Sequence, residues 1–455
     1  MVAETTQMVT EAIQWDTNKL VSAIVLVITF GAIFTEGIHK IHRTQVAMMG
    51  AGAMVIVGQI FGFYTPEGAL DAIDWNVVLL LGAMMTIVAI LAPTGGFQAI
   101  AYFIARISGG RLFLLMVLLG AAVSSLSLLL DNVTTVIIFG SLIVLICQAL
   151  QVSPIPFLFA VALLSNTGGV ASLVGDPPNL MIGSAADIDF NTFIMRMGVI
   201  VLFAWIATVG VLWFLFREKL SREPAKISFS TESAIVDKKV WYSGLAVLAI
   251  MVVLFILHSY LHWEAWVVAA FGLTLLLGIN YHVNLDKYLA ETELSLLLFF
   301  ASLFVIVGGV EHSQFLEYLA QFILPFVKED MLVACIILMW VAAILSAAID
   351  NIPFTAAMIP IILGMEAQGI DVTPLWWTLA IGVGLGGNGS HLGSTANVFI
   401  VTLSERLAEK EDKPSLAITP GLWFRKGTPV MITTLIVSSI GMWMFFDFFA
   451  KPLPN

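Results

Sequence analysis

The chain has 455 residues, of which 59% are hydrophobic and 11% are charged, whereas soluble domains carry about 25% charged residues. This composition indicates an integral membrane protein and excludes a soluble enzyme, a nucleic-acid binder and a disordered scaffold. The formal net charge is −11, but in a membrane chain the positions of Lys and Arg are more informative than their sum. The two cysteines, Cys147 and Cys335, form neither a disulfide framework nor a zinc motif.

Residues 1–19 are polar and lack the basic segment and cleavage site of a signal peptide, so we expect an outer segment followed by a span that is retained as a signal anchor. Eight apolar runs are long enough to cross a bilayer: 20–38, 44–62, 75–93, 192–216, 240–260, 265–280, 293–310 and 428–449. Gly, Pro and Asn interrupt 155–186 and 373–401, which predicts two broken helices. Two apolar arms surround a polar tip in 112–150 and in 331–370, which predicts two re-entrant hairpins.

These elements define the fold class and the organisation of the chain. We predict an all-α polytopic membrane protein with about ten transmembrane crossings, two re-entrant hairpins and two broken helices. We expect a first inverted repeat at 20–216, a cytoplasmic linker at 217–239, a second inverted repeat at 240–449 and a C-terminal tail at 450–455.

Basic residues indicate the orientation. With the N-terminus outside, and with each hairpin entering and leaving on one side, 16 of the 20 Lys and Arg residues fall in cytoplasmic loops, as the positive-inside rule requires. The predicted outer loop 63–74 contains Glu67, Asp71 and Asp74 but no Lys or Arg. We therefore predict a multi-pass protein of the cell (inner) membrane with its N-terminus outside.

The two halves of the chain repeat each other in one register. Phe97 recurs as Phe315, 218 residues later, and Asp131 recurs as Asp350, 219 residues later. The glycine pair of the first broken helix recurs in the second at the offset of 218. Each half contains an odd number of crossings, so the second half must insert upside down, and inverted repeats are typical of alternating-access carriers.

Each hairpin carries an aspartate at its polar tip, Asp131 in LLLDNVTT and Asp350 in AAIDNIPFT. A carboxylate near the bilayer centre costs about 2.5–3.5 kcal/mol on insertion scales, and such groups usually serve ions, protons or charge partners. The competing interpretation is that each aspartate caps the helix that follows. Because the feature is duplicated and no buried Lys or Arg is expected to pair with either aspartate, we favour a site for a hard monovalent cation or a proton.

The broken helices, SNTGGVASLVGDPPN at 165–179 and GLGGNGSHLGSTAN at 384–397, cannot continue as ordinary spans. Unwound backbone at that depth is tolerated only where it lines an enclosed or watery cavity, which predicts a binding site. Asp176 precedes two prolines and its counterpart is Ser394, and both are good helix N-caps. We interpret Asp176 chiefly as a cap, with direct ion contact as the alternative.

Other chemistries are excluded by missing motifs. The chain has no GxxxxGK[ST] phosphate loop, so transport is expected to be driven by a gradient. The pairs His39 with His42 and His258 with His262 lie at predicted span ends without a third ligand. We interpret these histidines as interfacial residues that bind no metal.

These motifs resemble those of the ion transporter superfamily, and within it the ArsB/NhaD permeases and the melanosomal P protein. The resemblance covers about residues 20–449. It implies that each repeat contributes a hairpin and a broken helix to one site for substrate and coupling ion, and it implies a homodimer. Dicarboxylate carriers of the superfamily have Ser-Asn-Thr at the hairpin tips, so Asp-Asn here argues against a sodium-coupled dicarboxylate carrier. NhaD-type antiporters share Asp-Asn, but their broken-helix loop is expected to lack the double proline.

The leading hypothesis is a secondary active Na⁺/H⁺ antiporter, with no enzyme activity, no cofactor and no nucleic-acid partner, and with H⁺ and/or Na⁺ as the coupling ion. The alternative is an ArsB-type efflux permease for arsenite, antimonite or another small anion, which could work with an ATPase subunit. Thiol capture of arsenic would need more cysteines than the two present. An anion channel and a dicarboxylate carrier rank lower.

The second broken helix is more polar than the first. Asn388 takes the place of Val170, and His391 takes the place of Leu173. Histidine titrates close to physiological pH, so His391 is a candidate pH sensor or proton acceptor, and the alternative is a neutral imidazole bonded to loop carbonyls.

The predicted ion-binding and substrate-binding residues are Asp131, Asn132, Thr134, Thr135, Ser165, Asn166, Thr167, Gly168, Gly169, Asp176, Asn179, Asp350, Asn351, Thr355, Asn388, Ser390, His391, Ser394, Thr395 and Asn397. Asp131 and Asp350 are the candidate Na⁺ ligands.

Overall fold

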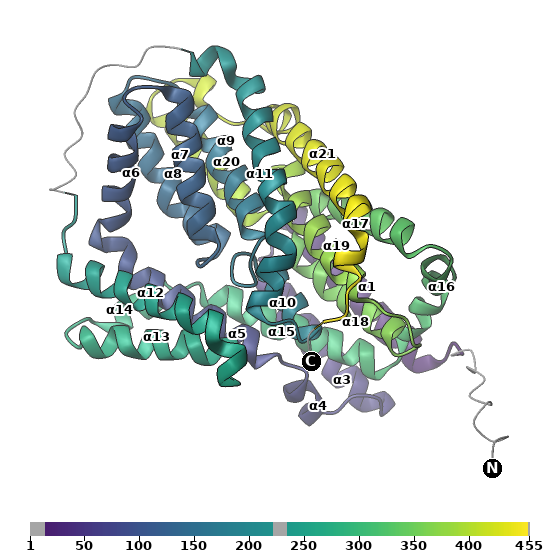
Figure 1. The fold of residues 1–455 in the computed structure, drawn as a ribbon. Coiled ribbons are helices and arrows are strands. Elements are labelled where there is room, and N and C mark those ends of the chain that lie inside the picture. The colour runs from purple at the N-terminus through teal and green to yellow at the C-terminus, as the bar shows by residue number, and fades with distance from the viewer. Residues whose placement is uncertain (1–13, 222–233, 454–455) are drawn as a thin grey trace. The chain divides into compact units, whose positions relative to one another are not determined.

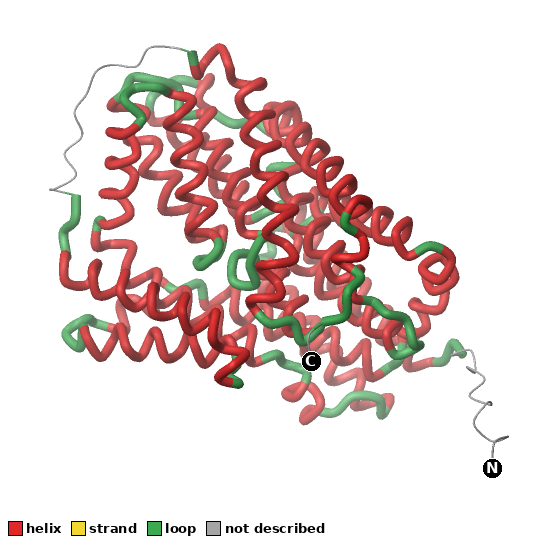
Figure 2. The backbone as a smooth tube through the Cα atoms, in the orientation of Figure 1, coloured by secondary structure: helices red, strands yellow, loops and turns green. Residues whose placement is uncertain are grey.

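Apolar runs in a bilayer must satisfy their backbone groups internally, which favours helices. The computed structural model describes residues 14–221 and 234–453. Within these ranges the regular elements are all helices and there is no strand (Figure 2). Nine of the described helices are long and apolar enough to cross a membrane. The predicted all-α polytopic class is confirmed.

The first half contains a series of helices that matches the predicted spans, the first hairpin and the first broken helix (Figure 1). They are α1 (Thr17–Phe34), α2 (Glu36–His39), α3 (Arg43–Phe61), α4 (Pro66–Asp71), α5 (Trp75–Leu91), η1 (Ala92–Thr94), α6 (Gly96–Ile107), α7 (Leu112–Ser127), α8 (Asn132–Ala149), α9 (Ile155–Gly169), α10 (Pro177–Ala185) and α11 (Phe190–Leu220).

The second half repeats this series. It contains α12 (Lys238–Leu261), α13 (Ala265–Ile279), α14 (Leu285–Glu291), α15 (Leu294–His312), α16 (Phe315–Glu329), α17 (Met331–Ala348), α18 (Asn351–Glu366), α19 (Thr373–Gly386), η2 (Gly387–Gly389), α20 (Thr395–Lys410), η3 (Pro414–Leu416), α21 (Pro420–Met444) and α22 (Phe446–Phe449). At the sequence offset, α7 and α8 correspond to α17 and α18, and α9 and α10 correspond to α19 and α20. Even the short α4 has its counterpart in α14.

Two helices of more than ten residues were not predicted. α6 and α16 precede the two hairpins, and both are amphipathic. In α6 the apolar side chains of Phe97, Ala101 and Ile104 are buried on one side. A helix of this length is too short to cross a bilayer at 1.5 Å per residue, so a search for long apolar runs does not detect it. The signal was present in the helical periodicity of the apolar residues.

The chain divides into two compact units, and neither coincides with one half of the sequence. Unit 1 contains Met1–Asp74, Leu298–Ala334 and Ala356–Val372. In unit 1, α1 packs on α3 and on α16. Trp15 lies against Tyr318 with ring centroids 5.2 Å apart. The Ser22 and Ser313 hydroxyls are hydrogen-bonded at 2.6 Å, so both halves of the sequence contribute to this unit.

Unit 2 contains Trp75–Leu297, Cys335–Thr355 and Thr373–Asn455. Within it α7 packs on α9, α11 packs on α21, and α9 packs on α19 and α20. The bulk of its core includes the fully buried Trp376, Trp377 and Trp423. All twenty predicted site residues belong to unit 2.

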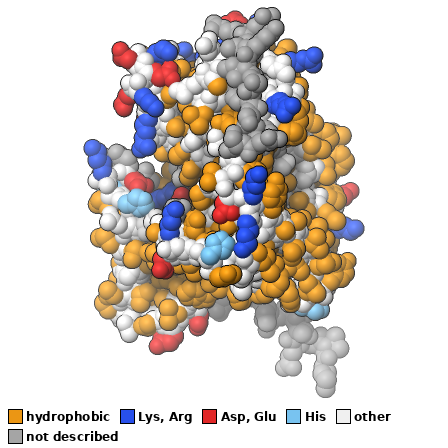
Figure 3. All heavy atoms as spheres, turned by 90° about the vertical axis from the view of Figure 1, so that its left-hand side faces the viewer, with side chains coloured by type: hydrophobic (Ala, Val, Ile, Leu, Met, Phe, Trp, Pro, Cys, Tyr) orange, Lys and Arg blue, Asp and Glu red, His pale blue; other side chains and the backbone are white. Residues whose placement is uncertain are grey.

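Hydrophobic side chains are also abundant on the surface, and they cover much of the face shown in Figure 3. Met195 and Phe214, both on α11, are 69% and 62% exposed. Contiguous exposed apolar surface of this kind marks contact with lipid or with another protein, which agrees with a chain built to lie in a bilayer.

Candidate functional site

The first hairpin turns between α7 and α8, and Asp131 caps α8. One carboxylate oxygen accepts a hydrogen bond from the Thr134 backbone N–H at 2.9 Å, and the other accepts one from the Thr134 hydroxyl at 2.6 Å. The Thr135 hydroxyl donates to the Asp131 carbonyl at 3.0 Å. The Asp131 side chain therefore caps α8, as the competing interpretation predicted, and both oxygens of the Asp131 carboxylate have a hydrogen-bond partner.

The second hairpin has the same plan between α17 and α18. The Ile352 N–H donates to Asp350 Oδ1 at 3.1 Å, and the Thr355 hydroxyl donates to the Asn351 carbonyl at 2.9 Å. Asp350 is half-buried, whereas Asn351 is 6% exposed.

In each repeat a serine links the hairpin to the broken helix by a hydrogen bond. Neither serine was among the predicted site residues. The Ser127 and Ser165 hydroxyls are hydrogen-bonded at 2.6 Å, and the Ser346 hydroxyl donates to the Val383 carbonyl at 2.8 Å. Ser127 and Ser346 occupy equivalent positions in the two repeats, so the repeat register contained the signal that could have identified them.

Glycines allow the backbone segments at the two ends of each broken-helix loop to approach closely. A Cβ added at Gly169 would lie 2.6 Å from the Gly175 carbonyl oxygen, and one added at Gly387 would lie 2.9 Å from the Gly393 carbonyl oxygen. Gly168 packs equally tightly, with an added Cβ 2.6 Å from the Ser124 Cβ. These positions require glycine because any larger residue would overlap backbone.

An asparagine clamps each loop. Asn179 Nδ2 donates to the carbonyls of Gly169 and Ser172 at 3.1 and 2.9 Å. Asn397 Nδ2 makes the equivalent bonds to the carbonyls of Gly387 and Ser390, at 2.8 and 2.9 Å. Both asparagine side chains are fully buried.

The two repeats meet at a cluster of amides around Asn166. Asn166 Nδ2 donates to the Oδ1 atoms of Asn388 and Asn397, each at 3.0 Å. Its own Oδ1 accepts from Asn132 Nδ2 at 3.2 Å and from the Ser394 hydroxyl at 3.3 Å. Each of these amides therefore has a hydrogen-bond partner within the cluster.

The second residue of the cluster, Asn388, is held on several sides. Its Nδ2 donates to the Thr167 hydroxyl at 3.2 Å, and its backbone carbonyl accepts from the Trp423 indole N–H at 3.2 Å. Trp423 lies on α21 and was not among the predicted site residues.

Asp176 stands at the N-cap position of α10, but its side chain makes no capping bond. The reason is the double proline: an N-cap side chain accepts from the N–H of the second or third helical residue, Pro178 has no N–H, and the Asn179 N–H donates to the Asp176 backbone carbonyl at 2.9 Å. The interpretation of Asp176 as a side-chain cap is wrong.

The Asp176 carboxylate is instead buried and only half satisfied. Its Oδ1 accepts a long bond of 3.4 Å from Asn351 Nδ2, across the boundary between the repeats. Its Oδ2 has no hydrogen-bond partner, and neither does Asn179 Oδ1. The charged groups that act on it electrostatically are the carboxylates Asp350 and, more weakly, Asp131.

His391 and its neighbours lie at the edge of this arrangement. His391 is half-buried, and Glu405 on α20 acts on it electrostatically. The Ser390 hydroxyl accepts from the N–H groups of Leu392 and Gly393 at 3.0 Å each, which shapes the loop. Thr395, the first residue of α20, is likewise partly exposed.

A buried arginine has its hydrogen-bond partners outside the predicted site residues. The buried Arg196 donates to the carbonyls of Phe448 and Lys451. Within the described residues no group of three or more His, Cys, Asp or Glu side chains is placed to hold a metal ion. A cation at Asp131 or Asp350 would therefore need amide or carbonyl oxygens as further ligands.

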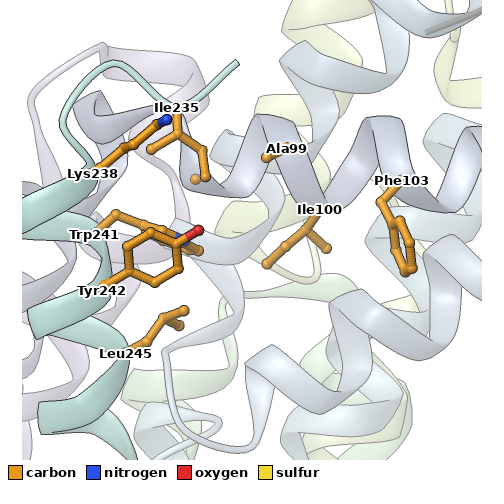
Figure 4. Close-up of a pocket in the computed structure, with 9 residues that line it drawn as sticks. Ala99, Ile100, Phe103, Ile235, Lys238, Trp241, Tyr242 and Leu245 are labelled. Atoms are coloured by element: carbon orange, nitrogen blue, oxygen red, sulfur yellow. The ribbon is translucent and has the colours of Figure 1, made fainter. Parts of the chain in front are cut away.

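A separate pocket of about 530 Å³ opens between α6 and α12. Figure 4 shows Ile100 and Phe103 on one side and Trp241, Tyr242 and Leu245 on the other, with Lys238 near its edge. None of the predicted site residues lines it, and its lining contains no carboxylate.

Comparison with known proteins identifies the family. Residues 24–382 match the citrate transporter family, CitMHS. The chain belongs to this family. The resemblance to the ion transporter superfamily is thereby confirmed, and the protein is a membrane transporter.

Relatives of this family member span nearly all of the chain. The "46 kDa membrane protein" of Mycobacterium leprae is 32% identical over 442 residues, which is 94% of this chain and 98% of that protein. An uncharacterized transporter of Mycobacterium tuberculosis is 33% identical over 415 residues, 89% of this chain and 94% of its own. The human P protein is 27% identical over 508 residues, and the match covers 93% of this chain but 59% of the P protein.

The fold is also similar to a solved structure. The YdaH transporter of Alcanivorax borkumensis, described as having an unusual topology, superposes with a TM-score of 0.60 over 97% of this chain and 100% of its own, at 14% sequence identity. At that identity the likeness concerns the fold alone.

Proposed function

We propose that the protein is a secondary active cation/proton antiporter that exchanges Na⁺ for H⁺ by alternating access. The observation that carries the proposal is the charge of the site where the two repeats meet. Asp176 is 1% exposed, and the charged groups that act on it are further carboxylates. A buried carboxylate without a basic partner is stable only when it is neutralised by a proton or by a cation.

The amide cluster supports the same choice of substrate. Asn166 donates to the side-chain oxygens of Asn388 and Asn397. The donors of Asn388 and Asn397 go to the Thr167 hydroxyl and to backbone carbonyls. The two unpartnered polar atoms of the first broken helix, Asp176 Oδ2 and Asn179 Oδ1, are both acceptors. Acceptor oxygens without donors attract a cation or a proton and repel an anion such as citrate.

Inverted repeats support alternating access, because the same framework can open toward either side of the membrane. We retain residues 20–216 and 240–449 as the two repeats, and we propose a homodimer. Under the arsenite alternative, an ATPase subunit would join the transporter. Cys147 and Cys335 are both buried in helices of unit 2, and no cluster of three thiols supports that alternative.

The test uses the purified protein in proteoliposomes that enclose a pH-sensitive dye. Pulses of Na⁺, Li⁺, K⁺, arsenite and citrate are given in turn, with protein-free vesicles as the control. We expect Na⁺ or Li⁺ to change the internal pH with saturable kinetics. A pH change caused by citrate or arsenite, with no response to any monovalent cation, would contradict the proposal.

We further propose that the N-terminus lies outside and the linker inside the cell membrane. α11 has 31 residues, about 46 Å at 1.5 Å per residue, so its two ends should lie on opposite sides. Asp187 and Ser221 flank α11 and are exposed. Single cysteines there, in a chain without Cys147 and Cys335, should be labelled from outside and from inside respectively. The reverse pattern would invert the orientation.

A further inference from the structure

The side chains that face Asp176 and Asn179 differ from those at the equivalent place in the other repeat. At the constant offset, Asp176 corresponds to Ser394, and Asn179 corresponds to Asn397. The oxygen of Asn397 accepts a bond from Asn166. The oxygen of Asn179 has no partner, so the two clamping asparagines make the same backbone contacts but end in different surroundings.

Gly384 is the cause of this difference. It occupies the position equivalent to Asn166, so the first loop lacks the amide that satisfies the second. A Cβ added at Gly384 would lie 3.5 Å from Asp176 Oδ2, and it would collide with Val170 Cγ2. Val170 in turn is the counterpart of Asn388. A glycine–valine contact therefore replaces the amide–amide contact of Asn166 with Asn388.

The orientation of Asn179 is fixed by its other bonds. Exchanging its amide O and N would place the oxygen against the carbonyls of Gly169 and Ser172, which cannot donate. The free atom is therefore an oxygen. With Asp176 Oδ2 it gives two buried acceptors that have no hydrogen-bond partner. They belong to the N-cap and the third residue of α10, and side chains three residues apart lie on the same face of a helix.

We propose that Asp176 and Asn179 form the single cation-holding pair of the transporter, and that the second repeat contains no equivalent. The inference rests on the proposed antiport function and names the residues that bind the exchanged ion. When Asp176 is protonated, its hydroxyl donates to Asn179 Oδ1. When Na⁺ binds, the proton leaves to water, and the ion lies between the carboxylate and the amide oxygen, which are hard ligands suited to it. One Na⁺ enters for one H⁺ released.

Asn351 and Asp350 complete the site from the other repeat. Asn351 Nδ2 reaches Asp176 Oδ1 at 3.4 Å, and Asp350 adds a negative field. Because both residues belong to the second hairpin, movement of that hairpin would change the affinity of Asp176 for its cation. Occupancy of the pair would thus be linked to the conformation of the opposite repeat.

The experiment measures proton release when Na⁺ is added to purified protein in weakly buffered detergent solution. The variant Asp176→Asn keeps an acceptor for Asn351 and supplies an amide N–H to Asn179, so it should fold. The matched control is Asp189→Asn, because Asp189 caps α11 through the N–H groups of Asn191 and Thr192 and lies outside the site. Thermal unfolding of each variant checks the fold.

We expect wild-type protein and Asp189→Asn to release protons equally, and Asp176→Asn to release about a hundredfold less at the same Na⁺ concentration, as expected for removal of one partner of a buried charge. Equal release by Asp176→Asn would overturn the inference while leaving antiport intact. No release by wild-type protein with any cation would overturn antiport itself.

If Asp176→Asn fails to fold, carbodiimide labelling of the wild-type protein replaces it. Na⁺ should protect Asp176 from the reagent. Equal labelling of Asp176 with and without Na⁺ would contradict the proposal.

Discussion

The two broken helices are held by the same backbone contacts but present different side chains to each other. In both, a helix ends at paired glycines, a short loop folds back, and an asparagine bonds two loop carbonyls. Around the second loop the polar atoms find partners through Asn166 and Asn388. Around the first loop Asp176 and Asn179 each keep an unpartnered oxygen. The asparagines that both repeats share thus hold the two loops, and the residues that differ, Asp176 and Gly384, leave the oxygens of the first loop without partners.

Apart from the loss of the Asp176 carboxylate itself, the largest effect should come from making the two loops alike. The double variant Gly384→Asn with Val170→Asn introduces the amide pair found at Asn166 and Asn388. The new amide at position 384 should donate to Asn179 Oδ1, so Na⁺-driven proton movement in proteoliposomes should fall by about a hundredfold, an effect of about 3 kcal/mol. Val170→Asn alone supplies no donor at position 384 and should retain most of the transport. Wild-type rates in the double variant would mean that the unpartnered oxygens have no role.

A smaller effect is expected at Asp350, which acts on Asp176 through its charge. Asp350→Asn keeps an acceptor for the Ile352 N–H but removes the negative field. An interaction of about 1 kcal/mol between partly buried charges corresponds to roughly a fivefold increase in the Na⁺ concentration that gives half-maximal transport. An unchanged half-saturation would show that the two carboxylates act independently.

Asp131 should affect stability more than transport, in contrast to Asp176. Asp131→Ala removes the cap of α8 and should lower the free energy of unfolding by about 1 kcal/mol, whereas Asp131→Asn should cost little because asparagine also caps. Thermal unfolding in detergent distinguishes the two variants. If both unfold like wild type and both lose Na⁺ exchange, then Asp131 is an ion ligand, as its position at the hairpin tip first indicated.

Much of this architecture could be predicted from the sequence, because apolar run length and repeat register are long-range signals. The hairpins, the broken helices and the amides of the site, including Asn166 and Asn388, followed from them. The roles of the aspartates did not, because they depend on which N–H groups are available. Pro178 lacks the N–H that would have let the Asp176 side chain cap α10. The sequence GDPPN already contained this information. The bond between Asn351 and Asp176 joins opposite repeats, and no local pattern indicates it.

The smallest effect concerns His391, the polar residue that only the second loop carries. It is half-buried and acted on by Glu405, apart from the amide cluster. His391→Gln should leave the maximal rate unchanged and flatten the pH dependence of transport on the acidic side of neutrality, where a histidine gains its proton. An unchanged profile at saturating Na⁺ would assign His391 a structural role.

The central claim is that one buried carboxylate in the first broken helix carries the exchanged cation. The most direct measurement is the initial rate of Na⁺-driven pH change in proteoliposomes that contain wild-type protein, Asp176→Asn or Asp189→Asn at equal density. The account predicts that Asp189→Asn matches wild type and that Asp176→Asn is indistinguishable from protein-free vesicles. Wild-type exchange by a folded Asp176→Asn protein would contradict it.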